Sequence, residues 1–376
     1  MEILIVHGID PYATKPGGTR SYILNLIDYL KNKNIKISLA AISSKKHMNK
    51  SDYDFIQLLK TSEVSSVKFF ITLCIKSVFL RISKKCIILT NRADNMLPFI
   101  LFFHNNPKVC VLHGLDKKKI ELRKGKIIGL IYNLIEHISL KYSDIIICVD
   151  SKTHKYYSTR YPSIKTKMKI IHVGIDLESF KPMDKKICRL KYSFPENEKI
   201  IMYVGRLEKE KNIEFIFFSL QHVYHKNMFV MVGNGNNKNF LHTLASSLKV
   251  NTYFAGTVPQ EKLSEILNCA DVLVISSLFE SGPLVVQEAI ACGIPVVTVD
   301  VGRVKEFITN EKIGIICNRN INEFANAIDK LLENNDKSLI DYRRTLAQKF
   351  SFQRTGFETL KLLKCLIIER REKNEP

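Results

Sequence analysis

The most informative stretch of the chain is Ser276-Ser-Leu-Phe-Glu280-Ser-Gly-Pro-Leu-Val-Val-Gln-Glu288-Ala-Ile-Ala-Cys-Gly293-Ile-Pro295. Pro283 suits the first turn of a helix, and Gly293 with Pro295 marks its end, so the pattern predicts a short helix between them. At a rise of about 1.5 Å per residue, Glu280 before the helix and Glu288 on it flank the helix N-terminus at different depths, with a phosphate between them. Sugar and ribose hydroxyls can donate to the two carboxylates, so this stretch predicts a nucleotide-sugar site.

Short apolar runs alternate with helical patterns on both sides of this stretch. Strands are predicted at 3–7, 35–41, 86–89, 109–113 and 145–149, and again at 199–205, 228–233, 252–255, 272–275, 295–298 and 314–317. This alternation predicts an α/β protein with two Rossmann-like, doubly wound parallel-sheet domains that face each other across a cleft. We expect an N-terminal domain at 1–180, completed by a C-terminal helix at 352–376, and a C-terminal domain at 181–351.

Length and composition agree with a folded two-domain protein. The chain has 376 residues, of which 45% are hydrophobic and 25% charged. Its nine cysteines contain no Cys-x-x-Cys pair and are interpreted as buried, reduced thiols. The first residues read as a strand and not as a signal peptide, and no stretch reaches the roughly 18 apolar residues that span a bilayer, so we expect a cytoplasmic protein.

Two cations follow the predicted strand 199–205. Arg206 and Lys211 lie in one loop, which the alternation places at the carboxyl edge of the second sheet, where ligands of such sheets bind. Arginine offers a fixed pair of donors and lysine a mobile charge, so together they suit a departing diphosphate. The alternative is an exposed charged turn.

A glycine pair follows the first predicted strand. Gly17 and Gly18 precede a periodic helix at 21–30, so their amides can approach an anion without Cβ obstruction. A plain turn is an equal alternative, because the full Gly-x-Gly-x-x-Gly spacing is absent.

Together, Gly205-Arg206 with Lys211, the Glu280-x7-Glu288 spacing and the Gly293-x-Pro295 ending resemble the retaining GT-B glycosyltransferases of the group 1 type. The resemblance implies a GT-B fold and a hexosyltransferase in which Arg206 and Lys211 hold the diphosphate, Glu280 contacts the donor sugar and Glu288 binds the ribose. It implies catalytic residues His113, Arg206, Lys211 and Glu280, and donor-binding residues Gly17, Gly18, Gly205, Arg206, Lys211, Glu280, Ser281, Gly282, Pro283, Leu284 and Glu288. The family often has asparagine before the glycine that matches Gly174, where this chain has Val173.

The resemblance also implies a mechanism and substrates. The acceptor hydroxyl attacks the face that the leaving phosphate vacates, and that phosphate takes its proton, so no carboxylate pair acts as in a glycosidase. No Asp-x-Asp motif is found between the domains, and we expect neither a metal nor another cofactor. The expected donor is a UDP- or GDP-sugar, and the expected acceptor is a glycan or a polyprenyl-linked or other lipid-linked sugar in bacterial surface polysaccharide or lipopolysaccharide biosynthesis.

Charge is concentrated in the first half of the chain. Residues 1–200 hold 35 Lys and Arg against 17 Asp and Glu, whereas residues 201–350 hold 16 of each kind. Basic residues Lys117, Lys118, Lys119, Arg123, Lys124 and Lys126 precede the apolar segment 127–135. With the apolar segment 67–82, they favour peripheral binding to an anionic membrane on the cytoplasmic side. The alternative is a core helix behind a solvated loop.

Three other functions fit part of the sequence. A sugar-nucleotide epimerase of related fold would use the same pocket without an acceptor, but the two cations and two glutamates favour transfer. A basic nucleic-acid-binding protein is suggested by charge alone, since the chain has no Trp, zinc spacing or RNA-binding aromatic signature. An inactive lectin-like module is disfavoured because all four donor side chains are present.

Overall fold

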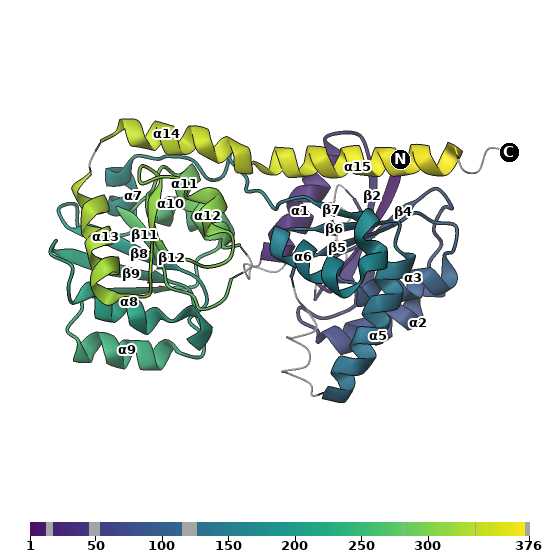
Figure 1. The fold of residues 1–376 in the computed structure, drawn as a ribbon, viewed down its shortest axis with the longest axis horizontal. Coiled ribbons are helices and arrows are strands. Elements are labelled where there is room, and N and C mark those ends of the chain that lie inside the picture. The colour runs from purple at the N-terminus through teal and green to yellow at the C-terminus, as the bar shows by residue number, and fades with distance from the viewer. Residues whose placement is uncertain (13–17, 45–52, 115–125, 281, 335, 373–376) are drawn as a thin grey trace. The chain divides into compact units, whose positions relative to one another are not determined.

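A computed structural model describes residues 1–12, 18–44, 53–114, 126–280, 282–334 and 336–372. The chain forms two compact units (Figure 1). The first unit comprises Met1–Val173 and Phe352–Pro376, and the second comprises Gly174–Ser351. Two predicted features, Gly17 and the basic residues 117–124, lie outside the described residues, as do Ser281 and the side chain of Lys126.

A seven-stranded parallel sheet forms the centre of the first unit, in the order β3-β2-β1-β4-β5-β6-β7. Its strands are β1 (Glu2–Val6), β2 (Lys36–Ile42), β3 (Asp54–Leu59), β4 (Ile87–Thr90), β5 (Lys108–Leu112), β6 (Ile145–Cys148) and β7 (Met168–Ile170). The five predicted strands are confirmed. The sequence analysis missed β3 and β7, the two edge strands, because β7 is only three residues long and β3 buries only Leu58 fully.

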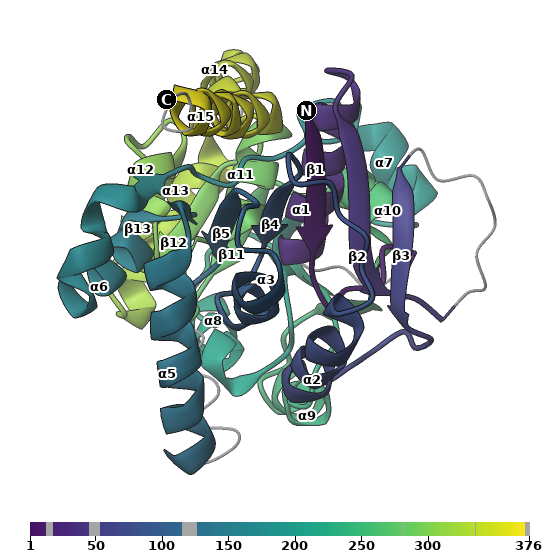
Figure 2. The same cartoon turned by 90° about the vertical axis from the view of Figure 1, so that its right-hand side faces the viewer.

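Helices cover both faces of this sheet (Figure 2). Side chains alternate along β1: Ile3 and Ile5 pack in a core with residues of α1 (Gly18–Lys31) and α15 (Phe352–Glu372), whereas Leu4 and Val6 pack in a second core. The second core takes residues from α2 (Ser66–Ser77), α3 (Leu97–Phe102), α5 (Lys126–Tyr142) and α6 (Ser151–Arg160). Two short 3₁₀ helices, η1 (Asp94–Met96) and η2 (Pro162–Lys167), complete the unit.

A six-stranded parallel sheet forms the centre of the second unit, in the order β10-β9-β8-β11-β12-β13. Its strands are β8 (Lys199–Val204), β9 (Asn227–Val232), β10 (Thr252–Gly256), β11 (Val272–Ile275), β12 (Val296–Val299) and β13 (Gly314–Cys317), and all six were predicted. Its helices are α7 (Lys185–Lys191), η3 (Lys209–Lys211), α8 (Ile213–Leu220), α9 (Lys238–Ser247), α10 (Gln260–Leu267), α11 (Leu284–Ala291), α12 (Val304–Phe307), α13 (Ile321–Glu333), α14 (Ser338–Ala347) and η4 (Gln348–Phe350).

The stretch before β8 is part of the second unit. Ile175, Leu177 and Phe180 are buried in its core, although the sequence analysis assigned residues 174–180 to the N-terminal domain. The same stretch contains α7, whose N-terminus is capped by the carboxylate of Asp184. The sequence analysis predicted no element in this stretch.

Both sheets share one topology. The first strand of each unit, β1 or β8, lies inside the sheet. The next two strands of the chain lie on one side of it, and the later strands lie on the other side. In such sheets the loops that follow these central strands, at their carboxyl ends, leave a crevice where ligands bind. No helix in the described ranges combines the length and apolar character that crossing a membrane requires.

Candidate donor-binding site

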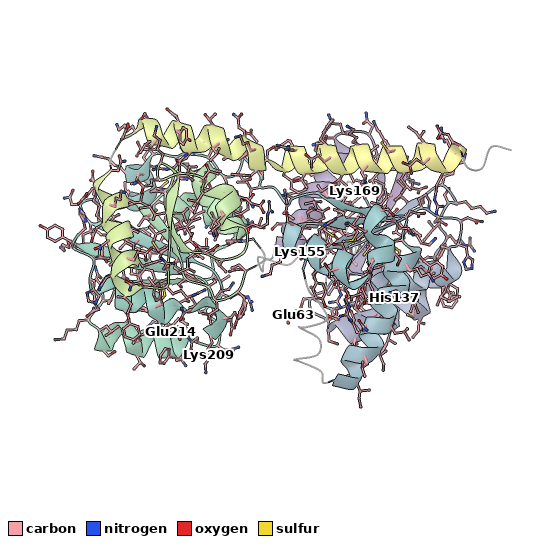
Figure 3. All side chains as sticks on the ribbon, viewed as in Figure 1. Glu63, His137, Lys155, Lys169, Lys209 and Glu214 are labelled. Atoms are coloured by element: carbon pink, nitrogen blue, oxygen red, sulfur yellow. The ribbon has the colours of Figure 1, made fainter. Side chains whose placement is uncertain are left out.

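The loop between β8 and α8 carries the first predicted cation. Gly205 follows β8, and a Cβ added there would lie 2.7 Å from the Tyr203 hydroxyl, so a larger residue would displace that side chain. The Tyr203 hydroxyl donates to the carbonyl of Arg206 at 3.0 Å. The Arg206 guanidinium is exposed and pairs with Glu210 at 2.9 Å. Lys209, at the start of η3, also lies on the surface of this unit (Figure 3).

Lys211 and Glu280 form an ion pair at the centre of the site. Both side chains are mostly buried, with exposed fractions of 12% and 21%. Ser277 donates its hydroxyl to the same carboxylate oxygen at 3.1 Å. The Ser276 hydroxyl donates to the Lys211 carbonyl at 2.8 Å, and the Leu278 amide donates to the Glu210 carbonyl at 2.8 Å. The loops that follow β8 and β11 are thus joined by backbone and side-chain bonds.

Arg319, which follows β13, binds the loop after β11. Its guanidinium donates to the carbonyls of Ser276 and Ser277, at 2.9 and 2.7 Å. The sequence analysis missed this residue. Arg319 lies two residues beyond the end of β13, so the argument that placed Arg206 at the carboxyl edge of the sheet also applied to it.

Glu288 is buried on α11. Burial raises the pKa of its carboxyl to about 7, and a hydrogen bond with the Gln260 side chain opposes part of that rise. A carboxyl group in this state is converted between its neutral and charged forms near neutral pH. Glu288 has no bond to Lys211 or Glu280 among the described contacts, so it forms a separate part of the site.

The start of α11 is close to Arg303. Pro283 is the residue before the helix and Leu284 is its first residue, and the helix has no side-chain cap at this end. A Cβ added to Gly282 would lie 3.4 Å from the Arg303 side chain, which pairs with Glu306 at 2.7 Å. A second arginine therefore lies beside the backbone that leads into α11.

Two glycines let the loop after β9 approach the loop after β8. Gly233 has a φ of +139°, and a Cβ added to it would lie 1.9 Å from the Gly205 carbonyl oxygen. A Cβ added to Gly235 would lie 2.3 Å from the Leu207 carbonyl oxygen. The Leu207 amide in turn donates to the Asn234 carbonyl at 3.0 Å. These contacts fix the backbone that carries Arg206.

His113 belongs to the first unit, where it follows β5. Its Nε2 lies 3.0 Å from Oδ1 of Asn91, which follows the neighbouring strand β4, and the Tyr22 ring packs edge-on against it at 4.9 Å. Gly18, the other predicted residue of this unit that the structure describes, begins α1. Asn91 is a second residue that the sequence analysis missed, although it too directly follows a strand.

Unsatisfied polar groups surround His113. Within the described residues, the Asn91 side-chain amide nitrogen and Nδ1 of His7 are buried and have no hydrogen-bond partner. Burial lowers the pKa of His7 to about 3, with further lowering from His113 and Arg92, so His7 is neutral. Buried donors and acceptors of this kind are suited to a hydroxyl-rich ligand, since leaving them unpaired costs about 1–3 kcal/mol each.

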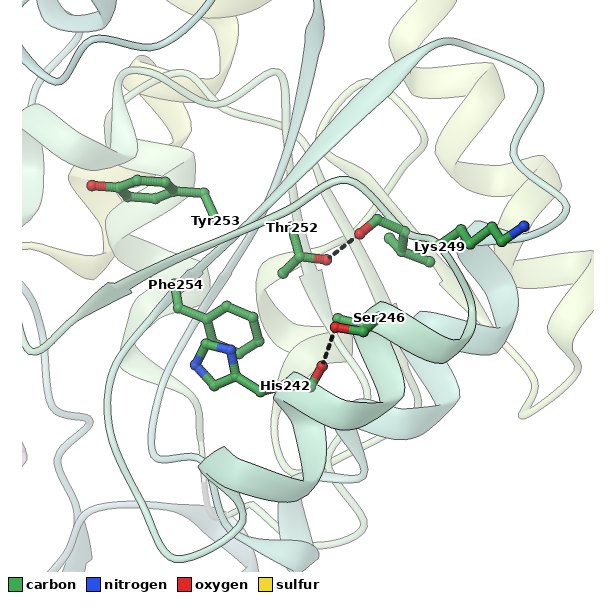
Figure 4. A pocket seen from close by; sticks show the side chains of 8 residues that line it. His242, Ser246, Lys249, Thr252, Tyr253 and Phe254 are labelled. Carbon is green, nitrogen blue, oxygen red and sulfur yellow. Dashed lines mark hydrogen bonds between the residues drawn. The ribbon is translucent and has the colours of Figure 1, made fainter.

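Other features of the second unit lie apart from these residues. A pocket between α9 and β10, at the edge of the sheet, is lined by His242, whose ring stacks on Phe254 at 3.5 Å (Figure 4). It contains none of the predicted donor residues. Across the described ranges, no three His, Cys, Asp or Glu side chains come together in a group suited to a metal ion.

The chain shares its fold with solved glycosyltransferases, and part of its sequence matches a glycosyltransferase family. Sucrose-phosphate synthase from Thermosynechococcus elongatus superposes with a TM-score of 0.83 over 98% of this chain and 99% of that chain, at 22% identity. The fold is therefore GT-B, as the sequence analysis predicted. Residues 184–348 match the family described as glycosyl transferases group 1. This match lies within the second unit.

Two curated relatives extend the match into the first unit. An uncharacterised glycosyltransferase of Methanocaldococcus jannaschii is 28% identical over 244 residues, which are 61% of this chain and 62% of that protein. The UDP-Gal:α-D-GlcNAc-diphosphoundecaprenol α-1,3-galactosyltransferase of Escherichia coli is 26% identical over 239 residues, 60% of each protein. The matches thus span about three fifths of these relatives.

Proposed function

We propose that this protein transfers a hexose-type sugar from a UDP- or GDP-sugar to a glycan or lipid-linked acceptor, with retention of the anomeric configuration. The observation that carries the proposal is the Lys211–Glu280 pair at the carboxyl edge of the second sheet. Arg206 lies in the loop that leads to Lys211, and the buried Glu288 follows on α11. The two cations can bind a diphosphate, and the two carboxylates can accept hydrogen bonds from the hydroxyls of a sugar and a ribose.

The reaction in this proposal needs no group beyond these residues and the two substrates. The bond between the anomeric carbon and the diphosphate oxygen breaks, and the acceptor oxygen forms a bond to the same face of that carbon. The acceptor's proton passes to the departing phosphate. Arg206 and Lys211 stabilise the charge that develops on the diphosphate, which is how fixed cations lower such a barrier.

The remaining predicted residues have supporting roles in the proposal. Glu280 accepts hydrogen bonds from the donor sugar, Glu288 accepts them from the ribose, and the backbone around Gly205, Gly282, Pro283 and Leu284 leaves room for the diphosphate. The carbonyl of His113 stabilises positive charge on the sugar ring. No metal or other cofactor takes part.

The acceptor is proposed to be a sugar on a lipid carrier, used in bacterial surface polysaccharide or lipopolysaccharide synthesis at the cytoplasmic face of the membrane. The E. coli relative supports this class, because its name specifies a diphosphoundecaprenol-linked sugar. A nucleic acid is not a proposed partner.

A panel of nucleotides tests the part of the proposal that concerns the sugar donor. UDP, GDP and their sugars are added to the wild type and to Glu288→Ala, and binding is followed by thermal shift and calorimetry, since a ligand of the folded state raises its stability. We expect one nucleotide to bind at micromolar concentration and Glu288→Ala to lose that binding. Glu333→Ala, at an exposed position on α13, is the matched control.

Either of two results would contradict the proposal. The first is that no nucleotide binds, and the second is that both glutamate variants bind as the wild type does. If a nucleotide-sugar binds, the stereochemistry is read from the anomeric proton of the product by NMR, and inversion would exclude the retaining mechanism.

A further inference from the structure

Three helices of the first unit lie side by side on one face of its sheet. The central helix, α3, contacts both α2 and α5 (Figure 2). Their inner residues, including Phe69, Leu73, Phe99 and Leu140, pack in the core on that face. Their outer surfaces therefore form one continuous surface.

The outer side of α5 is apolar. Ile127, Leu130, Ile131 and Leu134 lie at the spacing of one helix face, and their exposed fractions range from 55% to 76%. Glu136 and Leu140, on the inner side, are fully buried. The first half of α5 thus presents its apolar stripe to the outside, unlike a core helix.

The other two helices extend this stripe. Ile71 and Ile75 on α2, the following Val78 and Phe79, and Leu101 and Phe102 on α3 are all exposed, Phe79 by 79%. We call the exposed apolar residues of these elements the α2–α3–α5 face: Ile71, Ile75, Val78, Phe79, Leu101, Phe102, Ile127, Leu130, Ile131 and Leu134. Apolar surfaces of this extent on a folded chain mark a site of interaction with another molecule or with lipid.

From Val64 to Ala93, the charges beside the α2–α3–α5 face have one sign. No Asp or Glu occurs from Val64 to Ala93, whereas Lys68, Lys76, Arg81, Lys84 and Lys85 are all exposed there. Lys68 lies one helical turn before Ile71, and Lys76, in the last turn of α2, lies three residues before Phe79, which follows the helix. Within the sequences of the three helices the one acid is Glu136, which is buried and accepts a bond from Tyr157 at 2.8 Å.

We propose that the α2–α3–α5 face rests on an anionic lipid bilayer, with its apolar side chains in the boundary between headgroups and acyl chains. The exposed lysines and arginines then lie at the level of the lipid phosphates. A surface that combines apolar side chains with cations and lacks exposed acids binds anionic bilayers through burial of its apolar side chains and through electrostatic attraction. The proposal concerns the first unit alone and goes beyond nucleotide binding in the second.

A second copy of this chain is a poorer occupant of the same face. In a twofold dimer this patch of one copy meets the same patch of the other, so two surfaces with the same sign of charge would be brought together. Like charges brought together at an interface disfavour association, whereas anionic headgroups neutralise them.

Vesicle flotation of the full chain tests the proposal. The probe is a set of vesicles of phosphatidylcholine alone or with an equal share of phosphatidylglycerol, at physiological salt. We expect binding to the anionic vesicles only. Ile127→Ser with Ile131→Ser should weaken it at least tenfold, and so should Lys68→Glu with Lys76→Glu. Lys361→Glu with Lys364→Glu, two exposed lysines on α15 across the sheet, should change it less than twofold.

Three results would overturn the proposal: no binding to anionic vesicles, equal loss in the α15 control, or a wild-type dimer in light scattering that Ile127→Ser with Ile131→Ser converts to a monomer. Nucleotide binding is measured on every variant. An unchanged thermal unfolding profile shows that the first unit, which carries the substitutions, is folded. Nucleotide affinity reports on the second unit, so it separates failure here from failure of the proposed function.

Discussion

Lys211 and Glu280 form an ion pair across the ends of two adjacent strands, β8 and β11, although they are 69 residues apart in the chain. In the proposed function these side chains have different targets, since the lysine binds diphosphate and the glutamate binds the sugar. The pair then neutralises the lysine while the site holds no donor, and a donor has to separate the two groups when it binds. Donor binding therefore includes the cost of breaking this pair.

Replacing Glu280 by Gln should strengthen the binding of UDP. Without the carboxylate, the Lys211 ammonium is free for phosphate, and we expect the dissociation constant to fall roughly threefold to tenfold. Sugar transfer should fall at least about a hundredfold, because the donor sugar loses its charged acceptor. Calorimetry and a transfer assay measure the two effects. Weaker UDP binding in the variant would show that Glu280 supports the nucleotide itself.

Glu288 should make the stability of the protein depend on pH. Its pKa is about 7 in the folded state against an ordinary 4.5, so between these values the folded state holds a proton that the unfolded state has lost. The free energy of unfolding should therefore fall as pH rises from 4.5 to 7, by about 3 kcal/mol from this group. Urea unfolding of the wild type and Glu288→Gln measures the difference. A difference that is constant across this range would contradict the assignment.

Gly233→Ala should disrupt the donor site more than Gly256→Ala. Both glycines have positive φ, but a Cβ at Gly233 meets the Gly205 carbonyl oxygen, whereas one at Gly256 meets no atom within 4 Å. We expect Gly256→Ala to cost about 1–2 kcal/mol for backbone strain alone, and Gly233→Ala about 3 kcal/mol or more. Thermal unfolding and UDP binding should both show this order, and equal effects would be evidence against close contact between the two loops.

Arg319 should act as a positioning residue. Arg319→Met leaves the carbonyls of Ser276 and Ser277 without their donors, so the loop that carries Glu280 loses its support. We expect KM for the donor to rise about tenfold, with a smaller change in kcat and none in KM for the acceptor. Arg319→Lys should restore part of the donor KM. A uniform loss of active protein in both variants would indicate a role in folding only.

The sequence predicted those parts of the site that depend on local spacing. The helix after Pro283 and the loop that carries Arg206 and Lys211 follow from turn residues and strand ends within about ten residues. The pairing of Lys211 with Glu280 did not follow, because it depends on β8 and β11 being neighbours in the sheet. Arg319 and Asn91 were missed because neither belongs to a motif, although both follow strands.

For residues 127–135 the sequence favoured peripheral membrane binding and kept a core helix behind a solvated loop as the alternative. The apolar periodicity is the same in both cases, and only the structure shows that the apolar residues from Ile127 to Leu134 are exposed while Glu136 and Leu140 are buried. The strands β3 and β7 were missed because β7 has only three residues and β3 buries only Leu58 fully, so neither carries a clear apolar run.

The return of α15 to the first unit has a consequence for biosynthesis. Leu360, Leu363 and Leu366 share a core with Ile3 and Tyr22, so the first strand of the chain is packed by its last helix. All residues of the second unit, 174–351, leave the ribosome before that helix does. The second unit can fold during translation, whereas the face of the first sheet that α15 packs against is covered by α1 alone until residues 352–372 have left the ribosome.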